Sequence, residues 1–131
     1  MLYTKSIYGP ASIDDGLRIS VMSRHKQNDG ITDDPKITLN SFDVWYKILA
    51  PPAKLVGSYY RNELDFEEYS EQYLLYLSKP NISKVVKLLA KQSLFIDMTL
   101  LCVEDDATYC HRRLLAEEFR MYFPEINLVH R

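Results

Sequence analysis

The chain has 131 residues, a usual length for one domain, and its 47% hydrophobic and 26% charged residues are ordinary for a globular protein. The formal net charge of -2 argues against binding through a pervasive basic surface, and no stretch approaches the roughly 18 consecutive apolar residues of a membrane span. We therefore expect a single cytoplasmic domain over residues 1–131, with no membrane contact.

The first part of the chain predicts two strands and a polar loop. Residues 2–8 contain strand-forming side chains and end at a Gly-Pro turn signal, and residues 17–22 form a similar run. Residues 25–36 are too polar for a core and contain the turn signal Asp29-Gly30. A loop that begins where a strand ends often carries function.

The middle of the chain predicts one helix and one extended segment. Ser41 can cap a helix that Pro51-Pro52 stops, because the residue before a proline avoids the helical region. Its apolar face is formed by Phe42, Trp45, Ile48 and Leu49. Residues 54–59 then predict a short strand or extended segment.

Two amphipathic helices follow. Asp65 stands three residues before Glu68, an Asp variant of the capping box, at the start of a helix with one apolar stripe. The stripe consists of Phe66, Tyr69, Tyr73 and Leu77. Ser83 begins the next helix, for which we expect Val85, Leu88 and Leu89 to face inward.

The last third predicts the centre of the fold. Residues 94–103 are almost continuously apolar, as in a strand buried on both faces of a parallel sheet. A helix over 108–122 and a short strand over 126–129 complete the chain. Strands that alternate with helices indicate a three-layer α/β/α domain with a mostly parallel, Rossmann-like sheet.

In such sheets ligands bind beyond the carboxyl ends of the strands. The loops after Met22 and Val103 are expected to share that edge, which brings Arg24 to the sequence Cys110-His111-Arg112. These three residues fall in the first turn of the predicted last helix, where unpaired N–H groups and the helix dipole favour negative charge.

Cys110 is a candidate nucleophile there, because the helix field and its cationic neighbours lower a thiol pKa. The alternative is packing, since Cys110 lies one turn before Leu114, near the buried stripe. His111 and Glu104 are candidates for moving a proton. Arg24 and Arg112 are candidate anion binders, with surface salt bridges as the alternative.

The cysteines favour neither a disulfide nor a metal. Cys102 and Cys110 make a poor disulfide framework and lack CxxC spacing, which indicates a reducing compartment. Ligand types suited to a metal occur at Cys102, Glu104, Cys110 and His111, but their spacing matches no standard zinc pattern. We expect no cofactor and no metal, and the sequence contains no Walker, GxGxxG, HExxH or GxSxG motif.

An aromatic pair precedes a cation in Tyr59-Tyr60-Arg61. Aromatic rings beside arginine can stack on bases, so Tyr60 and Arg61 are candidate ligand-binding residues. The alternative is a set of partly buried rings with an arginine that reaches back to solvent.

Three segments resemble the Domain of Unknown Function 488 family over nearly the whole chain: residues 15–24, residues 49–61, and Leu100-Leu101-Cys102-Val103-Glu104 followed by Cys110-His111-Arg112. The strand end coupled to Cys-His-Arg is the most specific of them, and it has prompted suggestions of enzymatic activity in that family. The resemblance implies a compact α/β fold and a site without assigning a reaction. The implied site residues are Arg24, Cys102, Glu104, Cys110, His111 and Arg112.

Three functions remain open from the sequence. The first is an enzyme acting on a nucleotide, a nucleic-acid end or another anionic ligand. The second is a non-catalytic module that binds nucleic acid or protein through residues 59–61 and a basic edge at Arg24, His25 and Lys26. The third is a purely structural role of Cys-His-Arg in packing the last helix. The sequence leaves the oligomeric state open.

Overall fold

The predicted central strand is the middle of the sheet. In the computed structural model, which describes residues 1–131, it is β4 (Met98–Cys102), and all five of its residues are buried. β1 (Leu2–Ser6) pairs with one side of β4 and β2 (Leu17–Ser20) with the other. β5 (Leu128–His130) and β3 (Val44–Trp45) form the outer edges, so the strand order is β3-β2-β4-β1-β5 and every pairing is parallel.

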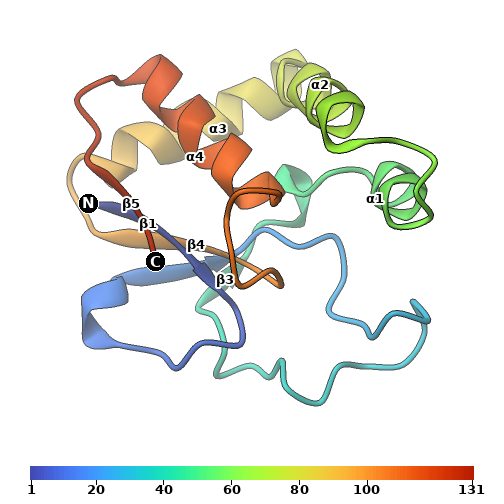
Figure 1. Cartoon of the computed structure of the whole chain (residues 1–131). Helices are drawn as coiled ribbons and strands as arrows, with labels where there is room; N and C mark the ends of the chain where they lie inside the picture. Colours follow the sequence, from blue (N-terminus) through green and yellow to red (C-terminus); the bar gives the residue numbers. More distant parts are fainter.

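The helices lie on one side of this sheet, and the first of them packs against the second, away from the centre of the sheet (Figure 1). They are α1 (Ala53–Tyr60), α2 (Phe66–Leu77), α3 (Pro80–Ser93) and α4 (His111–Tyr122). The 3-10 helix η1 (Ile13–Asp15) and long loops cover the opposite face (Figure 1). The predicted α/β fold with a parallel sheet is therefore confirmed, and its second covering layer is made mainly of loops. None of the helices combines the length and apolar character needed to cross a membrane.

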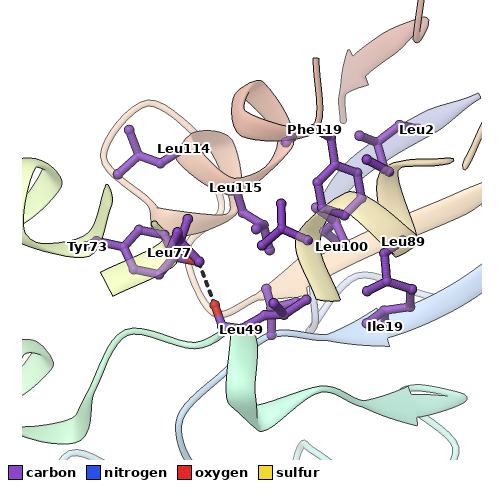
Figure 2. Packing of buried hydrophobic residues seen from close by; sticks show 14 of the residues in the cluster. Leu2, Ile19, Leu49, Tyr73, Leu77, Leu89, Leu100, Leu114, Leu115 and Phe119 are labelled. Atoms are coloured by element: carbon purple, nitrogen blue, oxygen red, sulfur yellow. Dashed lines mark hydrogen bonds between the residues drawn. The ribbon is translucent and has the colours of Figure 1, made fainter. Parts of the chain in front are cut away.

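The core lies between the sheet and the helices (Figure 2). Leu2 and Leu100 project from neighbouring strands toward Leu115 and Phe119 of α4, whereas Ile19 lies beside Leu89 of α3, and all six are buried. Burial of side chains of this size stabilises a fold by about 1.5 to 3 kcal/mol each. This packing fixes α4 against β1 and β4.

Helix α2 forms as the sequence predicts. The Asp65 carboxylate accepts a hydrogen bond from the Glu68 N–H at 2.8 Å, which caps the first turn. Tyr69, Tyr73 and Leu77 are buried along its inner face. The hydroxyl of Tyr73 donates to the Leu49 carbonyl at 2.6 Å, so this buried ring also satisfies its polar atom (Figure 2).

The segment between β2 and α2 differs from the prediction. The helix expected from Ser41 is wrong: Val44–Trp45 forms the edge strand β3, and Lys47–Leu49 forms only the single 3-10 turn η2. The backbone N–H of Asp43 donates to the Arg18 carbonyl, and that of Tyr46 to the Ser20 carbonyl. Pairing with the open edge of β2 therefore overrides local helical spacing.

The extended segment expected over residues 54–59 is also wrong, because this stretch is helix α1. Pro52 stands just before the first turn, where no backbone N–H is required. Helix α3 likewise begins at Pro80, three residues before the predicted start. Its buried face includes Val86 and Leu89, while Leu88, expected to face inward, is exposed.

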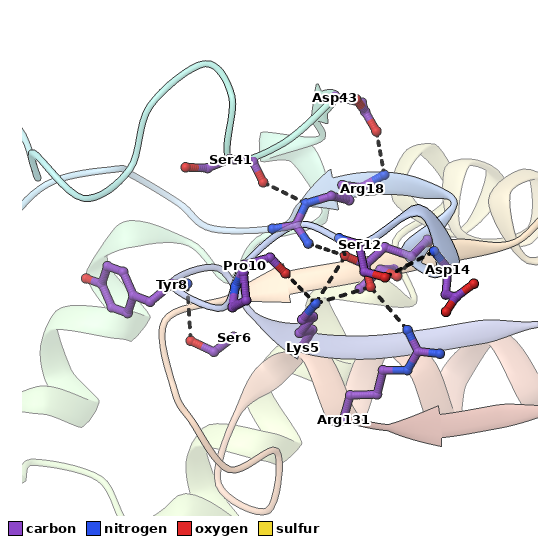
Figure 3. Close-up of polar contacts among 12 residues, drawn as sticks. Lys5, Ser6, Tyr8, Pro10, Ser12, Asp14, Arg18, Ser41, Asp43 and Arg131 are labelled. Atoms are coloured by element: carbon purple, nitrogen blue, oxygen red, sulfur yellow. Dashed lines mark hydrogen bonds and ion pairs between the residues drawn. The ribbon is translucent and has the colours of Figure 1, made fainter.

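The side chains of Lys5, Arg18 and Arg131 converge on the loop-covered side of the sheet (Figure 3). Asp15 is fully buried, and its carboxylate lies 2.5 Å from Nη1 of Arg18, 3.2 Å from Nζ of Lys5 and 3.1 Å from Nη1 of Arg131. Burial alone would raise the pKa of Asp15. The hydrogen bonds from the Ser12 N–H, Arg18 and Lys5 outweigh that effect and hold the pKa below its ordinary value.

We predict that Asp15→Asn lowers the free energy of unfolding by about 3 to 5 kcal/mol, because it leaves buried cations without their shared partner. Since the folded pKa of Asp15 is depressed, its contribution is present at neutral pH and is lost as the pH falls through that value. Urea denaturation of both proteins should therefore give a difference that shrinks in acid. The exposed neighbour gives the control Asp14→Asn, and an equal effect of both changes would contradict this role.

Candidate functional site

The strands end at one edge of the sheet beside an open cleft of about 1230 Å³. Segments that follow β1, β2 and β4 supply one side of it, and α1 with the base of α2 supplies the other. The predicted meeting of the loops after Met22 and Val103 is confirmed. The polar and aromatic side chains on its wall include Tyr8, Arg24, Lys26, Asp34, Lys36, Tyr60, Arg61, Tyr69, Cys102, Glu104 and His111.

A cluster of two thiols and one imidazole lies at the inner wall of the cleft. Cys102 ends β4, Cys110 is the N-cap of α4, and His111 is the first residue of that helix. Their ligating atoms all lie within 4.8 Å of one another, and Sγ of Cys102 is 3.6 Å from Nδ1 of His111. Cys102 and His111 contribute to the cleft wall, whereas Cys110 lies behind them.

Backbone hydrogen bonding sets the orientation of His111. Its Nε2 lies 2.7 Å from the Val21 carbonyl, which can only accept, so Nε2 carries the proton. This contact directs the other ring nitrogen, Nδ1, at Cys102. Tyr73 packs edge-on against the imidazole at 5.7 Å. A thiol beside an imidazole whose other nitrogen is held in place is the arrangement that activates nucleophiles.

The pKa values of the two thiols are displaced in opposite directions. A hydrogen bond from Cys102 lowers the pKa of Cys110 well below its ordinary value, with further help from His111 and the Arg112 guanidinium, while burial opposes this shift. The same interaction and burial raise the pKa of Cys102. The cluster therefore favours a thiolate at Cys110 that is stabilised by the Cys102 thiol.

These donors could also hold a metal ion, but only in part. Thiolate and imidazole are ligands that zinc prefers, and three of them converge here. Glu104, the fourth ligand type considered from the sequence, lies outside the group and accepts a hydrogen bond from the Tyr60 hydroxyl at 3.1 Å. Three donors fall one short of a closed structural zinc site, so the geometry does not require a metal.

Arg112 is fully buried and does not reach the cleft wall. Its Nη1 and Nη2 donate to the carbonyls of Glu104 and Asp105 at 2.5 and 3.2 Å, and its Nε has no partner. The alternative of a surface salt bridge is therefore wrong. The guanidinium instead ties the start of α4 to the loop that carries Glu104.

The cations of the cleft differ in their partners. Lys26 pairs with Asp33, and Arg61 pairs with Glu63 at 2.7 Å. Arg24 is exposed and forms no ion pair, and its guanidinium lies over Gly30, where a Cβ would come within 2.5 Å of Nη1. Gly30 has a φ of 72°, so both its conformation and this contact favour glycine.

The aromatic run 59–61 is divided between the core and the cleft. Tyr59 stacks on Tyr69 at 4.5 Å, whereas Tyr60 is exposed beside Glu104. His25, expected on a basic edge, is half-buried and packs on Trp45 at 4.0 Å. Its ring nitrogen is also within 2.7 Å of the Ser20 hydroxyl, so the exposed basic edge is reduced to Arg24 and Lys26.

Sequence reasoning missed Tyr8 and Tyr69 as cleft residues. Tyr8 follows β1, and the parallel order of the strands could have indicated its place at the common edge. Its hydroxyl hydrogen-bonds to Asp34 and so joins the end of β1 to the loop after β2. Tyr69 belongs to an apolar helical stripe, and nothing in its spacing distinguishes it from a core residue.

A comparison with protein families finds one match. The family model DUF488-N3a, described as "Active DUF488-N3 subclade", matches residues 2–122. The match covers every element that builds the cleft and the Cys-His cluster. No curated protein and no solved structure matches the chain.

We predict that Arg112→Lys lowers the free energy of unfolding by about 2 kcal/mol, because one ammonium cannot reproduce two charge-assisted bonds from a planar group. Chemical denaturation measures this loss. Arg113→Lys is the matched control, since Arg113 is partly exposed and pairs with Glu117, an interaction that contributes at most about 1 kcal/mol. A loss no larger at Arg112 than at Arg113 would show that the clamp is unimportant.

We also predict that Cys110 ionises below the ordinary thiol range when residue 102 can donate a hydrogen bond. Ultraviolet absorbance of the thiolate, titrated in Cys102→Ser, should show this depressed pKa, because the serine hydroxyl still donates. In Cys102→Ala the donor is absent, so the pKa of Cys110 should rise. The same titration curve in both variants would show that residue 102 does not stabilise a thiolate at Cys110.

Proposed function

The chain belongs to the DUF488 family, and we propose that it is an enzyme that acts on a phosphorylated or otherwise anionic small molecule, such as a nucleotide. One observation carries this proposal: an oriented thiol-imidazole pair, Cys102 and His111, faces a cleft whose rim holds an arginine, Arg24, that forms no ion pair. The description of the matching subclade as active agrees with a working site.

The anion is held by Arg24, with Lys36 nearby on the wall. Arg24 is exposed and has no ion pair to break, so its planar guanidinium is available to a phosphate or carboxylate. Lys36 lies 5.8 Å from the centre of the Tyr8 ring and also lacks an ion pair. The volume of the cleft suits a small ligand, and the rings of Tyr8 and Tyr60 offer faces for a planar group.

The reaction begins at Cys102, because this sulfur reaches the cleft. Its thiol proton passes to Nδ1 of His111 as Sγ bonds to the electrophilic atom of the ligand. The leaving group departs with the electrons of the broken bond and takes the proton back from the imidazolium. Glu104 at the mouth activates the water that releases the product.

Non-catalytic binding is the weaker alternative. Such a module would use Tyr60, Arg61 and the basic edge, yet Arg61 is engaged by Glu63 and Tyr60 by Glu104. Packing of His25 against Trp45 removes another of its expected contacts. A binding role would also leave the orientation of His111 toward Cys102 without a use.

The test is a binding screen that varies only the charge of the ligand. We predict that nucleoside phosphates raise the thermal midpoint of unfolding and that the matching nucleosides do not. For any ligand found, Arg24→Ala should weaken binding at least about tenfold, as expected for a charge-assisted contact. Arg120→Ala, near the far end of α4, is the matched control and should not change the affinity.

Turnover of the same ligand should disappear in Cys102→Ala and His111→Ala while binding persists. Equal binding of charged and uncharged ligands, or no effect of Arg24→Ala, would count against the anion site. Full turnover in Cys102→Ala would remove the thiol chemistry.

A further inference from the structure

Two free cysteines lie one behind the other at the inner wall of the cleft. Cys102 forms part of its wall, and Cys110 lies directly behind, with the two sulfurs within 4.8 Å of each other. Only seven residues separate them in the sequence, and both belong to the cluster around His111. Local spacing does not show this pair, because it forms only when α4 packs against the end of β4.

We propose that Cys102 and Cys110 are a redox-active dithiol that exchanges with anionic low-molecular-weight disulfides entering the cleft. Glutathione-like disulfides belong to this class, since their carboxylates can bind the same arginine that holds the phosphorylated ligand. The proposal rests on the anion-binding cleft of the proposed function and adds a second class of molecule that reacts there.

The exchange balances in two steps. Sγ of Cys102 attacks one sulfur of the disulfide and gives its proton to His111, which forms a mixed disulfide and releases one thiolate. Sγ of Cys110 then attacks Sγ of Cys102, forms the internal disulfide and releases the second thiolate. The protein loses two electrons, and the small disulfide gains them and becomes two thiols once protonated.

The surroundings of each sulfur match its part in the exchange. Cys102 has the contact with the cleft that the first attack requires. Cys110 has no such contact, but the charge of its sulfur is stabilised by the Cys102 thiol, His111 and Arg112, as an attacking thiolate requires. Once the internal disulfide has formed, Cys102 can no longer act as a nucleophile, so the enzyme is reversibly inactivated.

The test uses the full-length reduced protein and oxidised glutathione as the probe, with acid quenching, alkylation and intact mass measurement. In the wild type we expect both cysteines to become protected with no glutathionyl group retained. Cys110→Ser should keep one glutathionyl group on Cys102, because the second step is blocked. Cys102→Ser should remain unmodified, since Cys110 is behind the wall. Circular dichroism shows whether each variant is folded. Peptide mapping of the oxidised wild type shows the internal disulfide directly, so the test does not depend on the variants alone.

Charge selectivity separates this inference from the proposed function. Cystamine, a cationic disulfide, should react at least tenfold more slowly than oxidised glutathione, and Arg24→Ala should abolish the difference. If both thiols stay free in the wild type at every ratio of oxidised glutathione to protein, the redox-active role of the two cysteines is refuted, even if nucleoside phosphates still bind. Equal rates with both disulfides would overturn the anionic selectivity, whereas exchange without phosphate binding would overturn only the proposed substrate.

Discussion

The burial of β4 on both faces is the constraint from which the arrangement of the site follows. A strand with no exposed residue needs a neighbour on each edge and a layer on each face, and the parallel pairing with β1 and β2 provides the neighbours. Parallel strands end at the same edge, so the segments after all three strands meet there. Cys102 reaches the cleft because it is the last residue of this strand.

The second requirement is the position of α4, which begins with His111. Leu115 and Phe119 anchor the helix in the core, while two backbone contacts position its first turn: His111 to the Val21 carbonyl and Arg112 to the loop after β4. Both contacts use backbone oxygens, so they fix geometry without consuming the charge of a side chain. The charge of the Arg112 guanidinium is left to act on the buried thiols.

The two sides of the sheet use charge in different ways. On the loop-covered side, Asp15 neutralises Lys5, Arg18 and Arg131 in a buried network whose effect is stability. At the cleft, Arg24 is exposed and forms no ion pair, so its guanidinium can bind a ligand. The net charge of -2 does not show this division, because it sums paired and unpaired charges alike.

Sequence alone determined the central strand, the capped helix α2, the α/β class and the edge at which Arg24 and His111 meet. These features depend on apolar runs, capping and the order of elements, which are local properties of the chain. Only the tertiary structure decided that residues 44–45 are a strand, that Arg112 is buried against carbonyls, and that Cys102 rather than Cys110 faces the cleft. The strand and the buried arginine depend on partners that are distant in the sequence. The exposure of Cys102 instead of Cys110 depends on how the start of α4 packs against the end of β4. Neither residue spacing nor composition contains that information.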